Sequence, residues 1–69
     1  MGKLTGRQSL FAKHYSMGKS GKKAAILAGY SAKSAEVIAS ENLRKPEILK
    51  KVEAILVQNG IRLQRLRQR

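Results

Sequence analysis

The segment that decides the fold runs from residue 22 to residue 31 and reads KKAAILAGYS. Small residues recur in it at helical spacing, at Ala24, Ala25 and Ala28. Gly29 then stands where a helix must end through a left-handed backbone conformation, which glycine adopts at low cost. After only Tyr30 and Ser31 a second helical pattern begins. Two short helices joined by a tight turn at a glycine are typical of a helix-turn-helix.

The rest of the chain predicts helices on both sides of this segment and no strand. We expect an all-α fold, a small four-helix domain with a helix-turn-helix and helices over about residues 5–17, 21–28, 32–44 and 46–59. Local capping signals support the predicted start of each helix. Thr5 with Gln8 has the spacing of a capping box, Ser20 and Ser31 can cap the next two helices, and Pro46 suits a first turn.

The predicted core consists of the residues on one side of each helix. They are Leu4, Phe11, Ala12 and Tyr15; Ala24, Ala25 and Ala28 with apolar bulk from Ile26 or Leu27; Tyr30, Ala35, Ile38 and Ala39 with Asn42 or Leu43; and Ile48, Val52, Ile55 and Leu56. Gly60 is expected to end or kink the last helix. We therefore expect one helix-turn-helix DNA-binding domain over residues 1–60. Residues 61–69 are a basic tail or a helix extension that would start an oligomerisation region.

The charge balance indicates the partner. Fifteen Lys and Arg against four Asp and Glu give a net charge of +11 over 69 residues. Such an excess favours a polyanion, with double-stranded DNA ahead of an anionic membrane surface. No apolar run approaches the roughly 20 residues that span a bilayer. The N-terminus also lacks the apolar segment of a signal peptide, so we expect a soluble intracellular protein.

The second helix of a helix-turn-helix lies in the major groove with its N-terminal part nearest the base edges. The candidate DNA-binding residues around it are Ser31, Lys33, Ser34, Glu36, Val37 and Ser40. Lys33 could donate to guanine, Val37 could meet a thymine methyl, and Glu36 could accept from cytosine or pair with Lys33. Capping and phosphate binding are the alternatives for the serines.

Phosphate contacts are expected at the start of the preceding helix, from Lys19, Lys22 and Lys23, and more weakly from Arg7, Lys13, Arg44 and Lys45. The alternative for these lysines is a plain solvated surface. An enzyme is not expected. His14 is the only histidine, Cys and Asp are absent, and there is no phosphate loop or metal-ligand cluster. We therefore expect no catalytic residue, no metal and no cofactor.

Residues spread over positions 4–52 carry a family resemblance. They are Leu4-Thr5, Gln8, Phe11 and Tyr15, then Ala24-Ala25 and Ala28-Gly29-Tyr30-Ser31, and finally Ala35, Ala39-Ser40, Leu43, Pro46 and Ile48. Together they resemble the small terminase subunits of tailed bacteriophages. Two positions depart from the family pattern. Ser20-Gly21-Lys22 stands where Asn-Ala-Thr is frequent, and Asn42 where leucine is common.

The resemblance implies a DNA-binding subunit of the viral genome-packaging motor. Such a subunit recognises the packaging site and hands the DNA to the large terminase subunit, which holds the ATPase and nuclease activities. It implies the cytoplasm of the bacterial host as location, and a homo-oligomer for a full-length protein. Because this chain ends soon after the fourth predicted helix, a monomer is expected for it.

Two other functions use the same features. A helix-turn-helix transcriptional regulator also reads a DNA site, and only the family resemblance favours packaging over it. A membrane-active cationic helix would suit residues 61–69. A capped four-helix plan with an interhelical turn argues against that reading for the rest of the chain.

Overall fold

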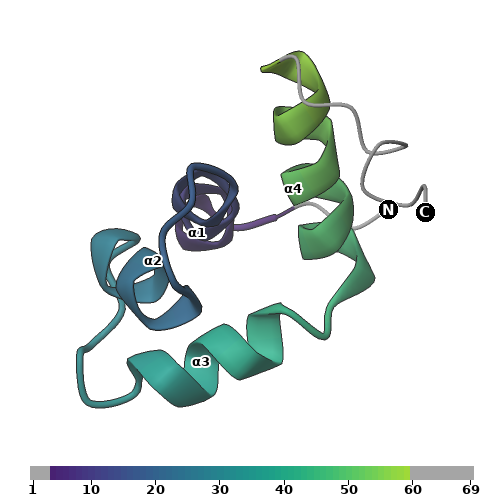
Figure 1. The fold of residues 1–69 in the computed structure, drawn as a ribbon. Helices are drawn as coiled ribbons and strands as arrows, with labels where there is room; N and C mark the ends of the chain where they lie inside the picture. The colour runs from purple at the N-terminus through teal and green to yellow at the C-terminus, as the bar shows by residue number, and fades with distance from the viewer. Residues whose placement is uncertain (1–3, 60–69) are drawn as a thin grey trace, which may run out of the picture.

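The computed structural model describes residues 4–59, which form four helices (Figure 1). These are α1 (Gly6–Ser16), α2 (Gly21–Leu27), α3 (Ala35–Asn42) and α4 (Pro46–Gln58). The expected all-α fold is confirmed, and the described part of the chain contains no strand. The predictions for Gly60 and for residues 61–69 lie outside the described residues.

The predicted capping signals fix the starts of three helices. The Thr5 hydroxyl oxygen accepts from the Gln8 backbone N–H at 3.1 Å, and the Thr5 N–H donates to Gln8 Oε1 at 3.0 Å. This reciprocal pair satisfies two backbone donors that a helix start leaves without a partner. The Ser20 hydroxyl accepts from the Lys23 N–H at 3.2 Å in the same way. Pro46 is the first residue of α4.

Two glycines end α1 and α2 with the same backbone motif. Gly18 and Gly29 have φ angles of 97° and 106°. After α2, the Gly29 N–H donates to the Ile26 carbonyl at 3.0 Å and the Tyr30 N–H donates to the Ala25 carbonyl at 3.1 Å. This pair of bonds is a Schellman motif, which needs a left-handed residue at the position of Gly29. The turn predicted at this glycine is therefore confirmed.

The chain enters α3 later than the sequence pattern predicts. The helix begins at Ala35, whereas the predicted start was residue 32. The Ser34 N–H donates to the Ser31 carbonyl at 3.1 Å, which is an i to i+3 bond. The Ser31 hydroxyl accepts from the Lys33 N–H at 3.2 Å, so it caps this turn and not the helix. The connection between α2 and α3 is longer than expected because residues 31–34 form a turn of their own.

The helices are arranged around α1. It packs against both α2 and α4, while α2 packs against α3 along the lower edge of the view in Figure 1. The buried core is made of Phe11, Ala12, Ala24, Ala25, Ala28, Ala35, Ala39, Ile48 and Val52. Leu4, Tyr15, Tyr30, Leu43, Ile55 and Leu56 pack against it and stay partly exposed. All of these residues were predicted core positions.

The prediction that Ile26 or Leu27 contributes to the core is wrong. Ile26 and Leu27 are 40% and 44% exposed, although one of them was expected to supply bulk to the core. The inner side of α2 carries only glycine and alanine, and Ile26 and Leu27 fall on the other sides of this short helix. Ile38 was also predicted to face inward and is only half-buried.

Gly21 shows how closely α2 and α3 approach each other. A Cβ placed on Gly21 would lie 3.1 Å from Ala39 Cβ and 3.8 Å from Leu43 Cδ1. The first turn of α2 therefore lies directly against the C-terminal half of α3. The sequence shows Gly21 only as a departure from the family pattern. In the structure it lies where the two helices approach closely, so a large side chain there would push them apart.

Asn42 is the buried polar residue of the core. Its side chain is 3% exposed, and its Nδ2 atom has no hydrogen-bond partner. A buried donor without an acceptor costs about 1–3 kcal/mol of stability. The unpartnered amide of Asn42 therefore lowers the free energy of unfolding noticeably, because the total for a small domain is only about 5–15 kcal/mol.

We predict that Asn42→Leu stabilises the domain, because it removes the unpartnered amide and keeps a similar side-chain volume. The expected gain in the free energy of unfolding is about 1–3 kcal/mol, measured by urea unfolding followed by circular dichroism. Gln58→Leu is the control, since it changes an exposed helical amide in the same way and should stay within about 0.5 kcal/mol. A loss of stability in Asn42→Leu would show that the amide is satisfied in solution.

A second prediction uses the two glycines that begin helices. Gly21→Leu should lower the free energy of unfolding by about 1–3 kcal/mol, because the new side chain forces α2 and α3 apart. Gly6→Leu is the matched control. Gly6 is also the first residue of its helix, but nothing lies within 4 Å of a Cβ placed there. Equal thermal midpoints for the two variants would contradict a close α2–α3 crossing.

Candidate nucleic-acid interface

The predicted phosphate contacts lie around the start of α2. Lys19 precedes the helix in the loop after Gly18, and Lys22 and Lys23 lie in its first turn. All three lysines are exposed. The Ser20 cap fixes the backbone between them, so the three ammonium groups project from one short, defined segment. The first backbone N–H groups of a helix also favour an anionic neighbour.

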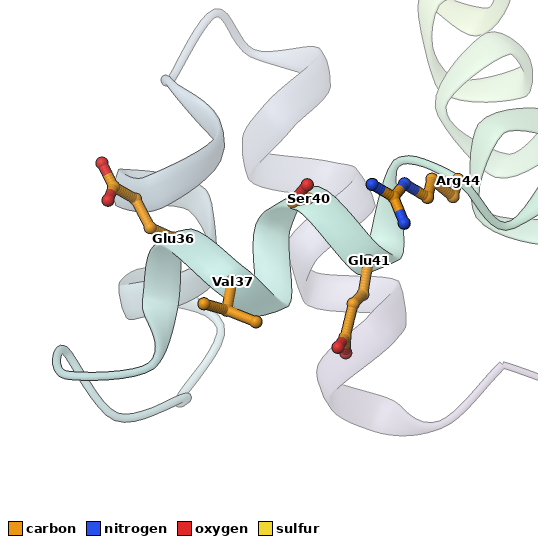
Figure 2. Close-up of a pocket in the computed structure, with 5 residues that line it drawn as sticks. All are labelled: Glu36, Val37, Ser40, Glu41 and Arg44. Atoms are coloured by element: carbon orange, nitrogen blue, oxygen red, sulfur yellow. The ribbon is translucent and has the colours of Figure 1, made fainter.

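The outward side of α3 carries a shallow open depression (Figure 2). Its lining residues are Glu36, Val37, Ser40, Glu41 and Arg44. Figure 2 shows Glu36 at the start of the helix, Val37 and Glu41 extending toward the same side, and Arg44 beyond its C-terminal end. Val37 is 61% exposed, so its side chain is accessible to a partner. The surface offers donors, acceptors and one apolar contact.

The crossing of the helices brings the first turn of α2 close to α3. Gly21 lies against Ala39 and Leu43, so the backbone of the neighbouring Lys22 and Lys23 is near the C-terminal half of α3. Arg44 follows that end of α3, one residue after the Leu43 cap. The predicted cations of the α2 start and the predicted residues of α3 therefore belong to two helices that pack against each other.

The opposite end of α3 holds the remaining predicted residues. Ser31 and Lys33 lie in the exposed turn before the helix, and Ser34 occupies the N-cap position without a side-chain cap bond. The Ser34 hydroxyl makes no bond to the helix start and is exposed. The capping alternative for this residue is therefore not seen, whereas Ser31 does bond within its turn. Cations flank both ends of α3, with Lys33 at its start.

Charge is distributed unevenly along the chain. The first 35 residues contain no Asp or Glu, and their basic residues are Lys3, Arg7, Lys13, Lys19, Lys22, Lys23 and Lys33. The four acidic residues are Glu36, Glu41, Glu47 and Glu53, which all lie on α3 or α4. The lysines at the start of α2 therefore have no acidic neighbour in their own segment, while α3 combines both signs.

One residue at this interface was not among the predicted contacts, and one of the weaker predicted phosphate contacts has a partner that the sequence did not suggest. Glu41 shares the α3 depression, and its spacing of four residues from Val37 was a usable signal for one helix face. Arg7 lies on α1, with its guanidinium carbon 5.8 Å from the centre of the Tyr30 ring. No local pattern could have found this contact, because it joins residues that are far apart in the sequence. Lys13, another of the weaker candidates, lies beside Lys51 and Ile55 of α4.

Other kinds of site were sought over residues 4–59. No group of three or more His, Cys, Asp or Glu side chains gathers there. His14 is half-buried on α1. None of the four described helices is long and apolar enough to cross a membrane.

Comparisons with known proteins agree with the resemblance seen in the sequence. A profile of the terminase small subunit family matches residues 4–65. The chain is 45% identical over 58 residues to the terminase small subunit of Bacillus phage SPP1. This alignment covers 83% of the chain and 40% of that protein, so the chain spans two fifths of the length of its relative. No solved structure matches the chain. The family profile covers well over half of the chain, and the chain belongs to the terminase small subunit family.

Proposed function

We propose that this chain is the DNA-binding part of a phage packaging terminase. In this role it holds double-stranded DNA against α3 and presents the packaging site to the large ATPase and nuclease subunit. The chain itself performs no catalysis and needs no cofactor. The observation that carries the proposal is the exposed surface of α3 with basic residues at both ends, next to a purely basic α2 start.

Phosphate contacts supply the affinity in this proposal. Lys19, Lys22 and Lys23 meet the backbone on one side of the major groove, and Lys33 meets it near the start of α3. Each lysine that neutralises a phosphate releases counterions, so binding weakens as the salt concentration rises. The contacts also set the position of α3 on the duplex, but they carry no sequence information.

Base contacts supply the selectivity. α3 has eight residues, and at about 1.5 Å per residue it is roughly 12 Å long, which suits the width of the major groove. Val37 meets a thymine methyl, Ser40 donates to a base acceptor, and Glu36 accepts from the cytosine amino group. The carboxylates of Glu36 and Glu41 disfavour DNA sequences that present only hydrogen-bond acceptors to them. They thereby increase the discrimination between sequences and lower the overall affinity.

One such domain makes few base contacts, so it binds weakly and with modest selectivity by itself. Several copies held together on one DNA would bind far more tightly, because each further contact becomes intramolecular. Residues 1–60 are the DNA-binding domain in this proposal. Residues 61–69 start the region through which copies of a longer protein assemble.

The Lys22→Ala, Lys23→Ala double variant tests the phosphate contacts. We expect the slope of log affinity against log salt to become shallower by about 1.8, since each lost contact contributes about 0.9. Fluorescence anisotropy with a labelled duplex at several salt concentrations measures this slope. Lys50→Ala with Lys51→Ala removes two adjacent lysines from α4 and serves as the matched control. If both double variants changed the slope equally, the binding would be nonspecific charge attraction and the proposed interface would be wrong.

The carboxylates of α3 give a prediction with the opposite sign. Glu36→Gln combined with Glu41→Gln should bind a duplex of arbitrary sequence several-fold more tightly, because two negative charges facing the phosphates are removed. Glu53→Gln on α4 should leave the affinity unchanged. The same anisotropy titration measures both. Unchanged binding of the double variant would mean that this face of α3 points away from the DNA.

A further inference from the structure

Arg7 joins α1 to the turn that leads into α3. Its guanidinium carbon lies 5.8 Å from the centre of the Tyr30 ring, within the range of a cation–π contact. Its Nε atom would lie 3.6 Å from a Cβ placed on Gly29, and its Cδ and Cγ atoms 3.9 Å. The side chain of Arg7 therefore runs across Gly29 and ends over Tyr30.

Gly29 borders the path of the Arg7 side chain. The φ angle of 106° requires a residue without a side chain, and the Schellman motif that ends α2 depends on it. A longer side chain at this position would occupy the space that Arg7 uses. Tyr30 is half-buried and packs against the core, so it gives the guanidinium a fixed platform.

Arg7 remains available to a ligand in this position. The residue is exposed, and it borders an open depression lined by Thr5, Gly6, Arg7, Gln8 and Tyr30. A guanidinium that stacks with its face on a ring keeps the N–H groups along its edge, which match the oxygens of a phosphate. No acidic residue precedes Glu36 in the chain, so no carboxylate from this part of the sequence competes for them.

The location of Arg7 indicates which phosphate it would meet. Tyr30 precedes the exposed turn of Ser31, Lys33 and Ser34, which opens into the start of α3. Arg7 therefore lies beside the residues that precede this turn, on the side of the chain that leads into α3. Arg44 follows the other end of the helix. A duplex lying along α3 would bring a backbone phosphate near each of these ends.

We propose that Arg7 binds a DNA phosphate and that Tyr30 positions it, which extends the interface from α2 and α3 to α1. This inference rests on the proposed function of DNA binding. Holding the arginine in place before binding reduces the side-chain entropy that the contact loses. A single fixed guanidinium thereby contributes more than a free surface lysine.

Anisotropy titrations of a labelled duplex at several salt concentrations test the inference on the full chain. Arg7→Ala should weaken binding several-fold and make the slope of log affinity against log salt shallower by about 0.9. Its thermal midpoint without DNA should change little. Lys13→Ala is the matched control, because Lys13 is an exposed cation on the same helix but lies beside Lys51 and Ile55 of α4. It should leave both the affinity and the slope unchanged.

Two further variants separate the charge from its platform. Arg7→Lys should keep the salt slope and lose part of the affinity, because an ammonium cannot bind a phosphate in a bidentate manner. Tyr30→Leu should do the same, since Arg7 keeps its charge and loses its fixed position. A Tyr30→Leu variant that binds like the parent chain would overturn the role of Tyr30.

The remaining outcomes distinguish the two proposals. If the parent chain binds duplex DNA with the expected salt dependence and Arg7→Ala has the same slope and affinity, the phosphate role of Arg7 is wrong. A lower thermal midpoint of Arg7→Ala with unchanged DNA binding would identify Arg7 as a structural link between α1 and the turn. That result would also overturn its proposed phosphate role. If the parent chain shows no salt-dependent binding to duplex DNA, the proposed function is wrong, and the inference about Arg7 is then wrong as well.

Discussion

The close crossing of α2 and α3 is the constraint on which the rest of the structure depends. A Cβ placed on Gly21 would lie only 3.1 Å from Ala39 Cβ, and the neighbouring inner positions of both helices are alanines. Such a contact buries little apolar area per residue, so large side chains elsewhere must stabilise the domain. Phe11 and Ile48, the largest fully buried side chains, come from the α1 and α4 side. The helix-turn-helix is thus stabilised by α1, which packs against α2 on one side and against α4 on the other.

This arrangement also explains why so many large side chains stay exposed. With alanines facing inward, Ile26, Leu27 and Val37 have no core position to occupy and lie 40–61% exposed. On α3 the result is a surface that mixes Val37 with Ser40, Arg44 and two carboxylates. Phosphate binding needs only positive charge, whereas base reading needs donors, acceptors and apolar contacts together. The basic α2 start and the mixed α3 face suit these two tasks separately.

Much of the fold could be predicted from local signals. Thr5 with Gln8, Ser20, Gly18, Gly29 and Pro46 act on the backbone within a few residues, and each does in the structure what its residue type favours. Helical spacing also located most of the core. It failed for Ile26 and Leu27 because spacing shows which residues share a face but not how near the next helix comes. The late start of α3 was missed because Ser31 suits a turn as well as a helix cap.

The site was less predictable than the fold. Exposure of the predicted residues agrees with the sequence pattern, yet their contact with DNA remains a proposal. The link between Arg7 and Tyr30 depends on how α1 packs behind the turn, which no spacing in the chain encodes. Asn42 is similar, because only the structure shows that its amide is buried without a partner.

The most direct test of the central claim is a titration of the ¹⁵N-labelled chain with duplex DNA, followed by two-dimensional ¹H–¹⁵N spectra at two salt concentrations. The account predicts that the amide signals of residues 19–23 and 31–40 shift progressively with added DNA. It also predicts that these shifts shrink at the higher salt concentration, while the signals of α4 stay in place. Shifts confined to α1 or α4, with residues 19–23 and 31–40 unaffected, would contradict an interface built on the α2–α3 crossing.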